Sequence, residues 1–148
     1  MRKILLLMAF VTAVVFAARA DKYTLDREQL PETAREMLTK HFPGKKVGMI
    51  KVDRHLLRKT DYDVRLTDGT KIEFNPSGKW TSVRMKKGAV PSGLVLRAIR
   101  NYVNKNHKGV DITEITKKRN GAYELKLSDG AELKFNALGG IKKVGVDD

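Results

Sequence analysis

The chain has 148 residues, of which 41% are hydrophobic and 32% charged, and its 30 lysines and arginines outnumber 17 acidic residues to give a net charge of +13. This length suits one compact domain and excludes a large multidomain enzyme. The apolar fraction supports a packed core, which excludes a disordered tail and a transmembrane bundle. The absence of cysteine excludes disulfides, thiolate metal sites and thiol nucleophiles.

The first 20 residues have the pattern of an export signal. Two basic residues precede an apolar run from Ile4 to Phe16, and Ala18 and Ala20 provide the small residues that a signal peptidase requires. The run is shorter than the roughly 20 residues that a membrane-spanning helix needs. We therefore expect a signal peptide at 1–20, cleavage before Asp21 and one exported domain at 21–148 without a transmembrane segment. Its net charge would be 13 − 3 = +10.

Two helices are expected, each after a proline. Apolar residues at helical spacing follow Leu30-Pro31 and, in the second half, Val90-Pro91. The first helix should end at Pro43-Gly44 and the second by Gly109. The residues at helical spacing are Ala34, Met37, Leu38 and Phe42 in the first helix, and Leu94, Val95, Ala98, Ile99 and Tyr102 in the second.

Alternating apolar and polar residues predict four strands after each helix. The expected ranges are 47–53, 61–66, 70–75 and 79–85 in the first half, and 112–118, 122–127, 131–136 and 140–146 in the second.

The chain contains an internal repeat. The segment Tyr62–Asn75 recurs as Tyr123–Asn136 at an offset of 61, and Phe42 matches Tyr102 at an offset of 60. The repeats run from about 30 to 88 and from about 90 to 148. Because a unit of about 60 residues is marginal alone, we expect an α+β fold in which two helix-plus-four-strand repeats form one antiparallel sheet with both helices on one face.

The turn at 67–69 sets the register of the second and third strands of each repeat. Only a three-residue loop with Gly69 in the left-handed conformation keeps the apolar side chains on one face. The register opposes Tyr62 to Phe74, Asp63 to Glu73, Val64 to Ile72 and Arg65 to Lys71, and in the second repeat Glu124 to Lys134 and Lys126 to Glu132.

Several motifs, mainly turn glycines and core aromatics, are shared with a known family. They are Leu30-Pro31, His41-Phe42-Pro43-Gly44, Tyr62-Asp63-Val64, Asp68-Gly69, Phe74-Asn75, Gly78-Lys79-Trp80 and their second-repeat counterparts. Together they resemble the PepSY-like family, exported proteins of Bacteroides-type bacteria that are described as similar to beta-lactamase inhibitory protein. The resemblance implies two helix-plus-four-strand units, a location in the periplasm or at the surface of a Gram-negative bacterium, and no catalytic activity.

No catalytic arrangement is found in the sequence. The histidines His41, His55 and His107 lie in separate segments without metal-ligand spacing, and no serine lies in a nucleophile elbow. Asp63 and Glu73 are explained as cross-strand neighbours on an exposed sheet face. We therefore predict a protein that is not an enzyme and has no catalytic residues, no metal site and no cofactor.

The exposed face of the sheet is the predicted binding surface. Alternation with Val83 would place Trp80 and Arg84 on this face, where Trp80 either covers a sheet edge or anchors an interface. Like charges at Arg65 and Lys71 oppose each other there. We predict that Arg65, Lys71, Trp80 and Arg84 bind an envelope or extracellular protein, with an acidic partner suited to the positive charge.

A second set of candidate residues lies at the hairpin tips, and consists of Arg54, Arg58, Lys59, Lys117, Lys118 and Arg119. These residues are either solvated loops or a site for anionic lipid or polysaccharide. Export disfavours nucleic acid as the partner. The leading hypothesis is a non-enzymatic exported protein-binding or inhibitor-like module, and the alternative is a binder of anionic lipid or polysaccharide at the cell envelope.

Overall fold

The structure, a computed structural model, describes residues 21–54 and 60–146. The expected signal peptide and the candidates Arg58 and Lys59 lie outside these residues. The elements are β1 (Lys22–Thr24), η1 (Arg27–Gln29), α2 (Glu32–His41), β2 (Val47–Asp53), β3 (Asp61–Leu66), β4 (Lys71–Phe74), β5 (Trp80–Arg84), η2 (Ser92–Leu94), α3 (Arg97–Asn106), β6 (Ile112–Lys117), β7 (Tyr123–Leu127), β8 (Ala131–Phe135) and β9 (Ile141–Val146).

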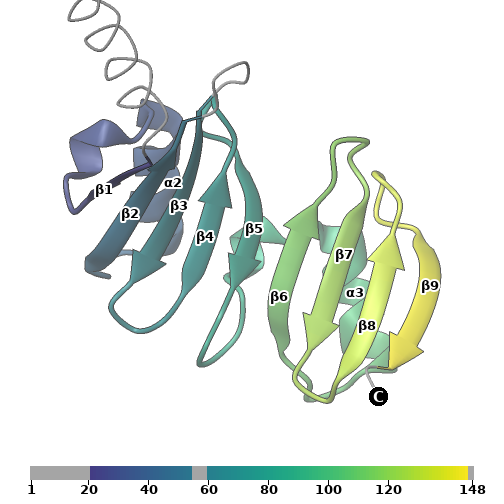
Figure 1. Ribbon diagram of the computed structural model, residues 1–148. Helices are drawn as coiled ribbons and strands as arrows, with labels where there is room; N and C mark the ends of the chain where they lie inside the picture. Colours follow the sequence, from purple (N-terminus) through teal and green to yellow (C-terminus); the bar gives the residue numbers. More distant parts are fainter. Residues whose placement is uncertain (1–20, 55–59, 147–148) are drawn as a thin grey trace, which may run out of the picture.

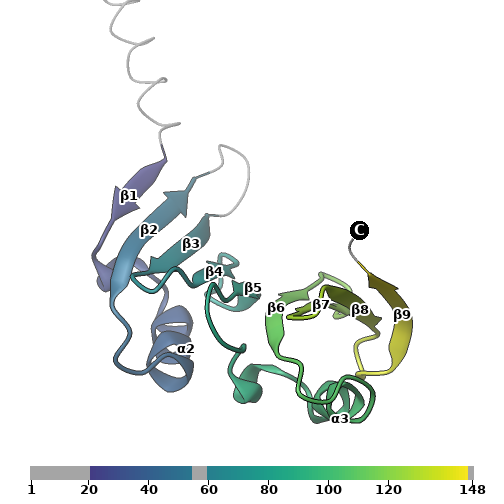
Figure 2. The ribbon, with the colours of Figure 1, turned by 90° about the horizontal axis from the view of Figure 1, so that it is seen from below.

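The strands form one nine-stranded antiparallel sheet in which each strand lies beside its neighbours in the sequence, from β1 to β9. Helix α2 packs behind the first half of the sheet and α3 behind the second half, on the same face (Figures 1 and 2). The predicted α+β class and the common face of the helices are confirmed. Strand β1, which pairs with β2, was not predicted.

The core lies between the helices and one face of the sheet. In α2 the residues Ala34, Met37 and Leu38 are buried, which matches the predicted helical spacing. In β3 the residues Val64 and Leu66 are buried while Arg65 between them is exposed. Burial of each large apolar side chain contributes about 1.5–3 kcal/mol. Within the described residues, no helix covers the opposite face of the sheet (Figure 2).

The predicted register is confirmed in both repeats. Gly69 has φ +91°, and β3 pairs with β4 so that Asp63 opposes Glu73 and Arg65 opposes Lys71. In the second repeat Glu124 opposes Lys134 and Lys126 opposes Glu132. The eight predicted strands agree with the structure to within one residue at each end.

The predicted start of the second helix is wrong. Pro91 precedes η2, which contains Leu94, and α3 begins only at Arg97. The structural equivalent of Pro31, which precedes α2 with φ −54° and ψ 149°, is Leu96, with φ −55° and ψ 141°. The helices therefore correspond at an offset of 96 − 31 = 65, and the match of Phe42 to Tyr102 at 60 does not hold. The longer β2–β3 connection of the first repeat restores the offset of 61 for the later strands.

The turn before the last strand of each repeat packs against the start of its helix. Asn75 and Asn136 close these turns, each by accepting backbone N–H groups at Oδ1. A Cβ atom added at Gly78, which has φ +82°, would lie only 2.7 Å from Pro31 Cβ. One added at Gly139, which has φ +86°, would lie 2.9 Å from Ala98 Cβ. The absence of a side chain at these two glycines therefore lets each turn pack closely against its helix.

We expect Gly78→Ala and Gly139→Ala each to lower the free energy of unfolding by about 2 kcal/mol or more, because a left-handed backbone costs about 1–2 kcal/mol and overpacking adds to it. Urea denaturation measures the loss. The control is Gly109→Ala, since Gly109 has φ +73° but no neighbour within 4 Å of its Cβ position. Equal losses in all three variants would contradict the packing role.

Candidate functional site

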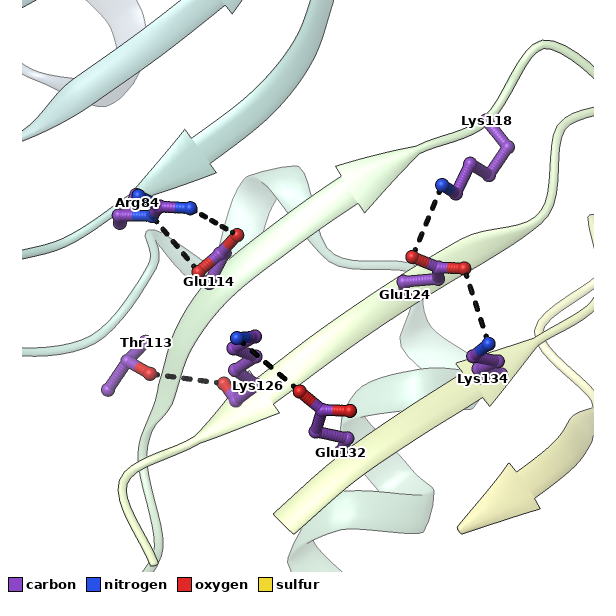
Figure 3. A network of polar contacts seen from close by, with 8 residues as sticks. All are labelled: Arg84, Thr113, Glu114, Lys118, Glu124, Lys126, Glu132 and Lys134. Carbon is purple, nitrogen blue, oxygen red and sulfur yellow. Dashed lines mark hydrogen bonds and ion pairs between the residues drawn. The ribbon is translucent and has the colours of Figure 1, made fainter. Parts of the chain in front are cut away.

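The helix-free face of the sheet carries charged side chains in rows that run across the strands. Figure 3 shows the part of this face in the second repeat. The charged residues in these rows are Lys51, Asp63, Arg65, Lys71, Glu73, Arg84, Glu114, Glu124, Lys126, Glu132, Lys134 and Lys143.

In the second repeat these charges form ion pairs with one another (Figure 3). The ammonium of Lys126 lies 3.4 Å from the Glu132 carboxylate, and Glu124 lies between Lys118 at 3.3 Å and Lys134 at 3.7 Å. Opposite charges that face each other across strands stabilise the sheet modestly. This surface therefore neutralises much of its own charge.

In the first repeat Lys51 forms ion pairs with Asp21 at 3.4 Å and Asp53 at 3.8 Å. Lys71 reaches Glu73 on its own strand at 3.4 Å, while Arg65 forms no ion pair within the described part of the chain. Burial, followed by repulsion from Glu73, raises the pKa of the Asp63 carboxyl group above its ordinary value, although Lys71 and Lys51 act in the opposite direction. Asp63 thus lies among both carboxylates and lysines, and burial is the main cause of its raised pKa.

Arg84 has a structural partner. Its guanidinium donates two hydrogen bonds of 3.1 Å, from Nε and from an Nη, to the two carboxylate oxygens of Glu114 (Figure 3). This bidentate pair joins β5 to β6 and therefore the first repeat to the second. The prediction of a binding face centred on Arg84 overlooked this pairing, because the sequence did not show that the two repeats meet at these strands.

Trp80 does not lie on the face predicted for it. The register between β4 and β5 shifts after Glu73, so that Thr81 is an extra residue and Trp80 pairs with the buried Phe74. Trp80 is half-buried and packs against the core. Alternation from Val83 gave the wrong face because a β-bulge adds one residue and reverses the side-chain order beyond it.

A groove lies where the two repeats meet, at the ends of β5 and β6, and has a volume of 1180 Å³. One wall is acidic and comes from the first repeat. The other wall is the basic tip between β6 and β7, and Trp80 lies along the groove. The charged residues are Asp53, Asp61, Asp63 and Glu73 on the first wall, with Lys79, and Lys117, Lys118 and Arg119 on the second.

The groove brings together only some of the predicted site residues. Trp80 and the tip of the second repeat line it, whereas Arg65, Lys71 and Arg84 lie outside it on the open sheet. Arg54 is exposed and does not line the groove. Sequence reasoning missed the acidic wall. The sequence feature that could have indicated this wall is the alternation of Asp61 and Asp63, which lie on the strand next to the one that ends with the outward-facing Asp53.

The basic tip also borders a second, smaller pocket of 540 Å³ within the second repeat. Four cations line it, together with the rings of Tyr123 and Phe135 and the carboxylate of Glu124. The ammonium of Lys117 lies 5.8 Å from the centre of the Tyr123 ring, a cation–π contact that holds the tip in place. The four cations are Lys118, Arg119, Lys134 and Lys142.

Among residues 21–54 and 60–146, no group of three or more His, Asp or Glu side chains is arranged to hold a metal ion. The two described histidines lie at helix ends. Burial, with a contribution from Lys40, lowers the pKa of His41, and Nδ1 of His107 lies 3.7 Å from the Asp129 carboxylate. His41 lies close to Gly93 in η2, and His107 lies beside Asp129 in the turn between β7 and β8.

Comparison with known proteins identifies the family. The model of the family described as "Putative beta-lactamase-inhibitor-like, PepSY-like" matches residues 60–143. The protein belongs to this PepSY-like family, as its turn and core motifs predicted. No curated protein sequence matches the chain.

Three solved Bacteroides structures are similar over most of their length. A "putative periplasmic protein of unknown function" from Bacteroides vulgatus is 40% identical, with a TM-score of 0.79, over 85% of this chain and 99% of that one. A second B. vulgatus "putative periplasmic protein" is 37% identical, with a TM-score of 0.78 and coverages of 86% and 98%. A "putative calcium-regulated periplasmic protein" from Bacteroides thetaiotaomicron is 31% identical, with a TM-score of 0.78 and coverages of 84% and 96%.

These relatives confirm the predicted location of the protein, which is exported to the periplasm or surface of a Gram-negative cell. Within the part of the chain that the structure describes, no helix has the length and apolar character to cross a membrane.

The Arg84–Glu114 pair should stabilise the joint between the repeats. In a double-mutant cycle with Arg84→Ala and Glu114→Ala, we expect a coupling energy of about 1 kcal/mol, because the pair is bidentate but Arg84 is largely exposed. Urea denaturation of the four proteins measures it. A coupling energy of zero would contradict the proposed role of the pair.

The raised pKa of Asp63 predicts a pH-dependent effect on stability. Because the folded state favours its protonated form, its contribution is present at low pH and is lost as pH rises above the ordinary value of 3.8. Asp63→Asn should therefore unfold at higher urea than the wild type at pH 7, and the difference should vanish near pH 3.

Asp68 provides a control of opposite sign, because a hydrogen bond from the Thr70 backbone N–H lowers its pKa. Asp68→Asn should lose stability at pH 7 and not at low pH. The account of Asp63 is wrong if its Asn variant is less stable than the wild type at pH 7.

Proposed function

We propose that this protein is a non-enzymatic periplasmic module that binds a partner protein through the groove between its two repeats. The observation that supports the proposal best is the groove itself, in which an acidic wall, a basic wall and Trp80 lie together. Such a surface suits recognition because opposite charges on the two walls orient a partner that carries both signs.

Trp80 is suited to anchor the contact. Tryptophan is enriched among the residues that dominate binding energy, particularly in sites that exclude water. Because the core already holds one side of the Trp80 ring, binding would order it at little further entropic cost. The bulge that turns Trp80 toward Phe74 thus leaves it as part of the groove and not as an isolated surface ring.

The open sheet beside the groove would extend the contact. Arg65 and Lys71 lie opposite each other there, and Arg84 is held in place by Glu114. Arginine in a fixed position loses little conformational freedom on binding. A partner with acidic side chains would complement these three cations.

Inhibition of an enzyme is one form that this binding could take, in line with the family description. An inhibitor needs a rigid surface that covers an active site and needs no catalytic group of its own. A continuous sheet with a groove meets this requirement, and the fold by itself does not select the enzyme.

The second candidate function is binding of anionic lipid or polysaccharide. The pocket within the second repeat favours it, since four cations line a volume of 540 Å³. Such cations suit a sugar or headgroup that carries a phosphate, sulfate or carboxylate. Glu124 offsets part of this charge through its ion pairs with Lys118 and Lys134.

Trp80 is the single tryptophan of the chain, so its fluorescence reports directly on the groove. We expect a partner fraction from the periplasm to change this fluorescence, and Trp80→Ala to reduce capture of the partner at least tenfold, as expected for an interface anchor worth about 2 kcal/mol. Tyr23→Ala, which removes an exposed ring outside the groove, should capture normally.

Salt separates the two candidate functions. Capture through the groove should persist when salt rises from about 0.05 to 0.5 M, whereas binding of a polyanion should fall steeply as its charges are screened. Lys134 and Lys142 line the smaller pocket and not the groove. Loss of binding with Lys134→Ala and Lys142→Ala together, but not with Trp80→Ala, would refute the groove proposal and support the second candidate.

A further inference from the structure

Among the strands that the structure describes, the last strand of the sheet has an open edge. Strand β9 pairs with β8 on one side and ends the strand order on the other. It is six residues long, whereas the opposite edge of the sheet is formed by the three-residue strand β1. An edge of this length offers a row of backbone N–H and C=O groups to an extended segment.

The first repeat shows what can pair with such a strand. Strand β5 is the equivalent of β9, since Trp80 corresponds to Ile141 and Val83 to Val144 at the offset of 61, and each strand contains an equivalent bulge. In the first repeat the outer edge of β5 is occupied by β6, which pairs in antiparallel orientation. The second repeat has no described strand in this position.

Apolar side chains of β9 are more exposed than the equivalent side chain in β5. Val83 is fully buried, whereas its equivalent Val144 is 50% exposed, and Ile141 is 41% exposed. Both belong to positions that pair with the buried Leu133 and Phe135. An apolar strip therefore runs along β9 on the helix side of the sheet, where a further strand would cover it.

The lysines of β9 favour an acidic strand as its pairing partner. Ser82 opposes Thr116 at the junction of the repeats, and the residue equivalent to Ser82 is Lys143. With its neighbour Lys142, Lys143 would face the same lysines if a second copy of this chain paired with β9. Like charges on adjacent strands destabilise pairing, whereas an acidic residue opposite Lys143 stabilises it.

We propose that β9 is a docking edge for an extended acidic segment of a partner protein, which adds to the sheet as an antiparallel strand in the way that β6 adds to β5. Main-chain hydrogen bonds would supply affinity, and apolar residues over Val144 with an acidic residue opposite Lys143 would supply specificity. This edge is separate from the groove, and the proposal rests on the pairing and exposure of β9 and not on the groove.

The β6 sequence provides the probe. A fluorescein-labelled peptide of residues 110–117 carrying T116E should bind the protein, as measured by fluorescence anisotropy, because the register of the junction places position 116 opposite Lys143. The same peptide with T116K should bind about two- to fivefold more weakly, the range expected for cross-strand charge pairs.

The matched variant is Lys143→Glu, an exposed substitution that replaces the like-charge pair with Lys134 by an opposite-charge pair and therefore should not destabilise the fold. It should reverse the preference, binding the T116K peptide more tightly than the T116E peptide. Amide chemical shifts in the NMR spectrum should move along β9 on addition of the T116E peptide. Three results would each overturn the proposal. They are peptide affinities that do not depend on residue 143, chemical-shift changes at β5 without changes at β9, and dimerisation of the protein through β9.

Discussion

The pairing of β5 with β6 is the interaction on which the rest of the structure depends. Three residue pairs join the strands, with Val83 and Ile115 fully buried at the centre and Arg84 bound to Glu114 on the outer face. Two backbone hydrogen bonds extend the junction, from Met85 N–H to Thr113 and from Val90 N–H to Ile112. Because a unit of about 60 residues buries too little apolar surface to be robust alone, this short ladder makes two marginal units into one sheet. It also positions the two walls of the groove.

The two repeats carry different charged side chains on their outward faces although their backbones are alike. In the second repeat Glu124 and Glu132 form ion pairs with lysines on or next to neighbouring strands. In the first repeat Asp53, Asp61, Asp63 and Glu73 line the groove, which the basic tip of the second repeat also lines. The repeats have diverged in their outward side chains while the residues that pack inward remain equivalent. This pattern is expected when the fold is kept and the binding surface is specialised.

Most of the fold could be predicted from the sequence because period-two alternation and turn glycines are local signals. The loop at 67–69 determined the register of Arg65 with Lys71, and the structure agrees. The helix offset was misjudged because Pro31 and Pro91 look equivalent but precede different elements. The site was less predictable. A bulge at Thr81 changes the face of Trp80, and the Arg84–Glu114 pair depends on contacts between repeats, which no single segment reveals. The acidic wall likewise forms only when β2, β3 and β4 align.

The central claim is that a partner binds where the two repeats meet, and site-specific photocrosslinking in the native periplasm tests it most directly. A photoreactive phenylalanine analogue would replace Trp80 in one variant and the exposed Tyr23 in another. The account predicts one discrete crosslinked protein from position 80 and none from position 23. Crosslinking that is equal at both positions, or absent at position 80 while the variant remains folded, would contradict it.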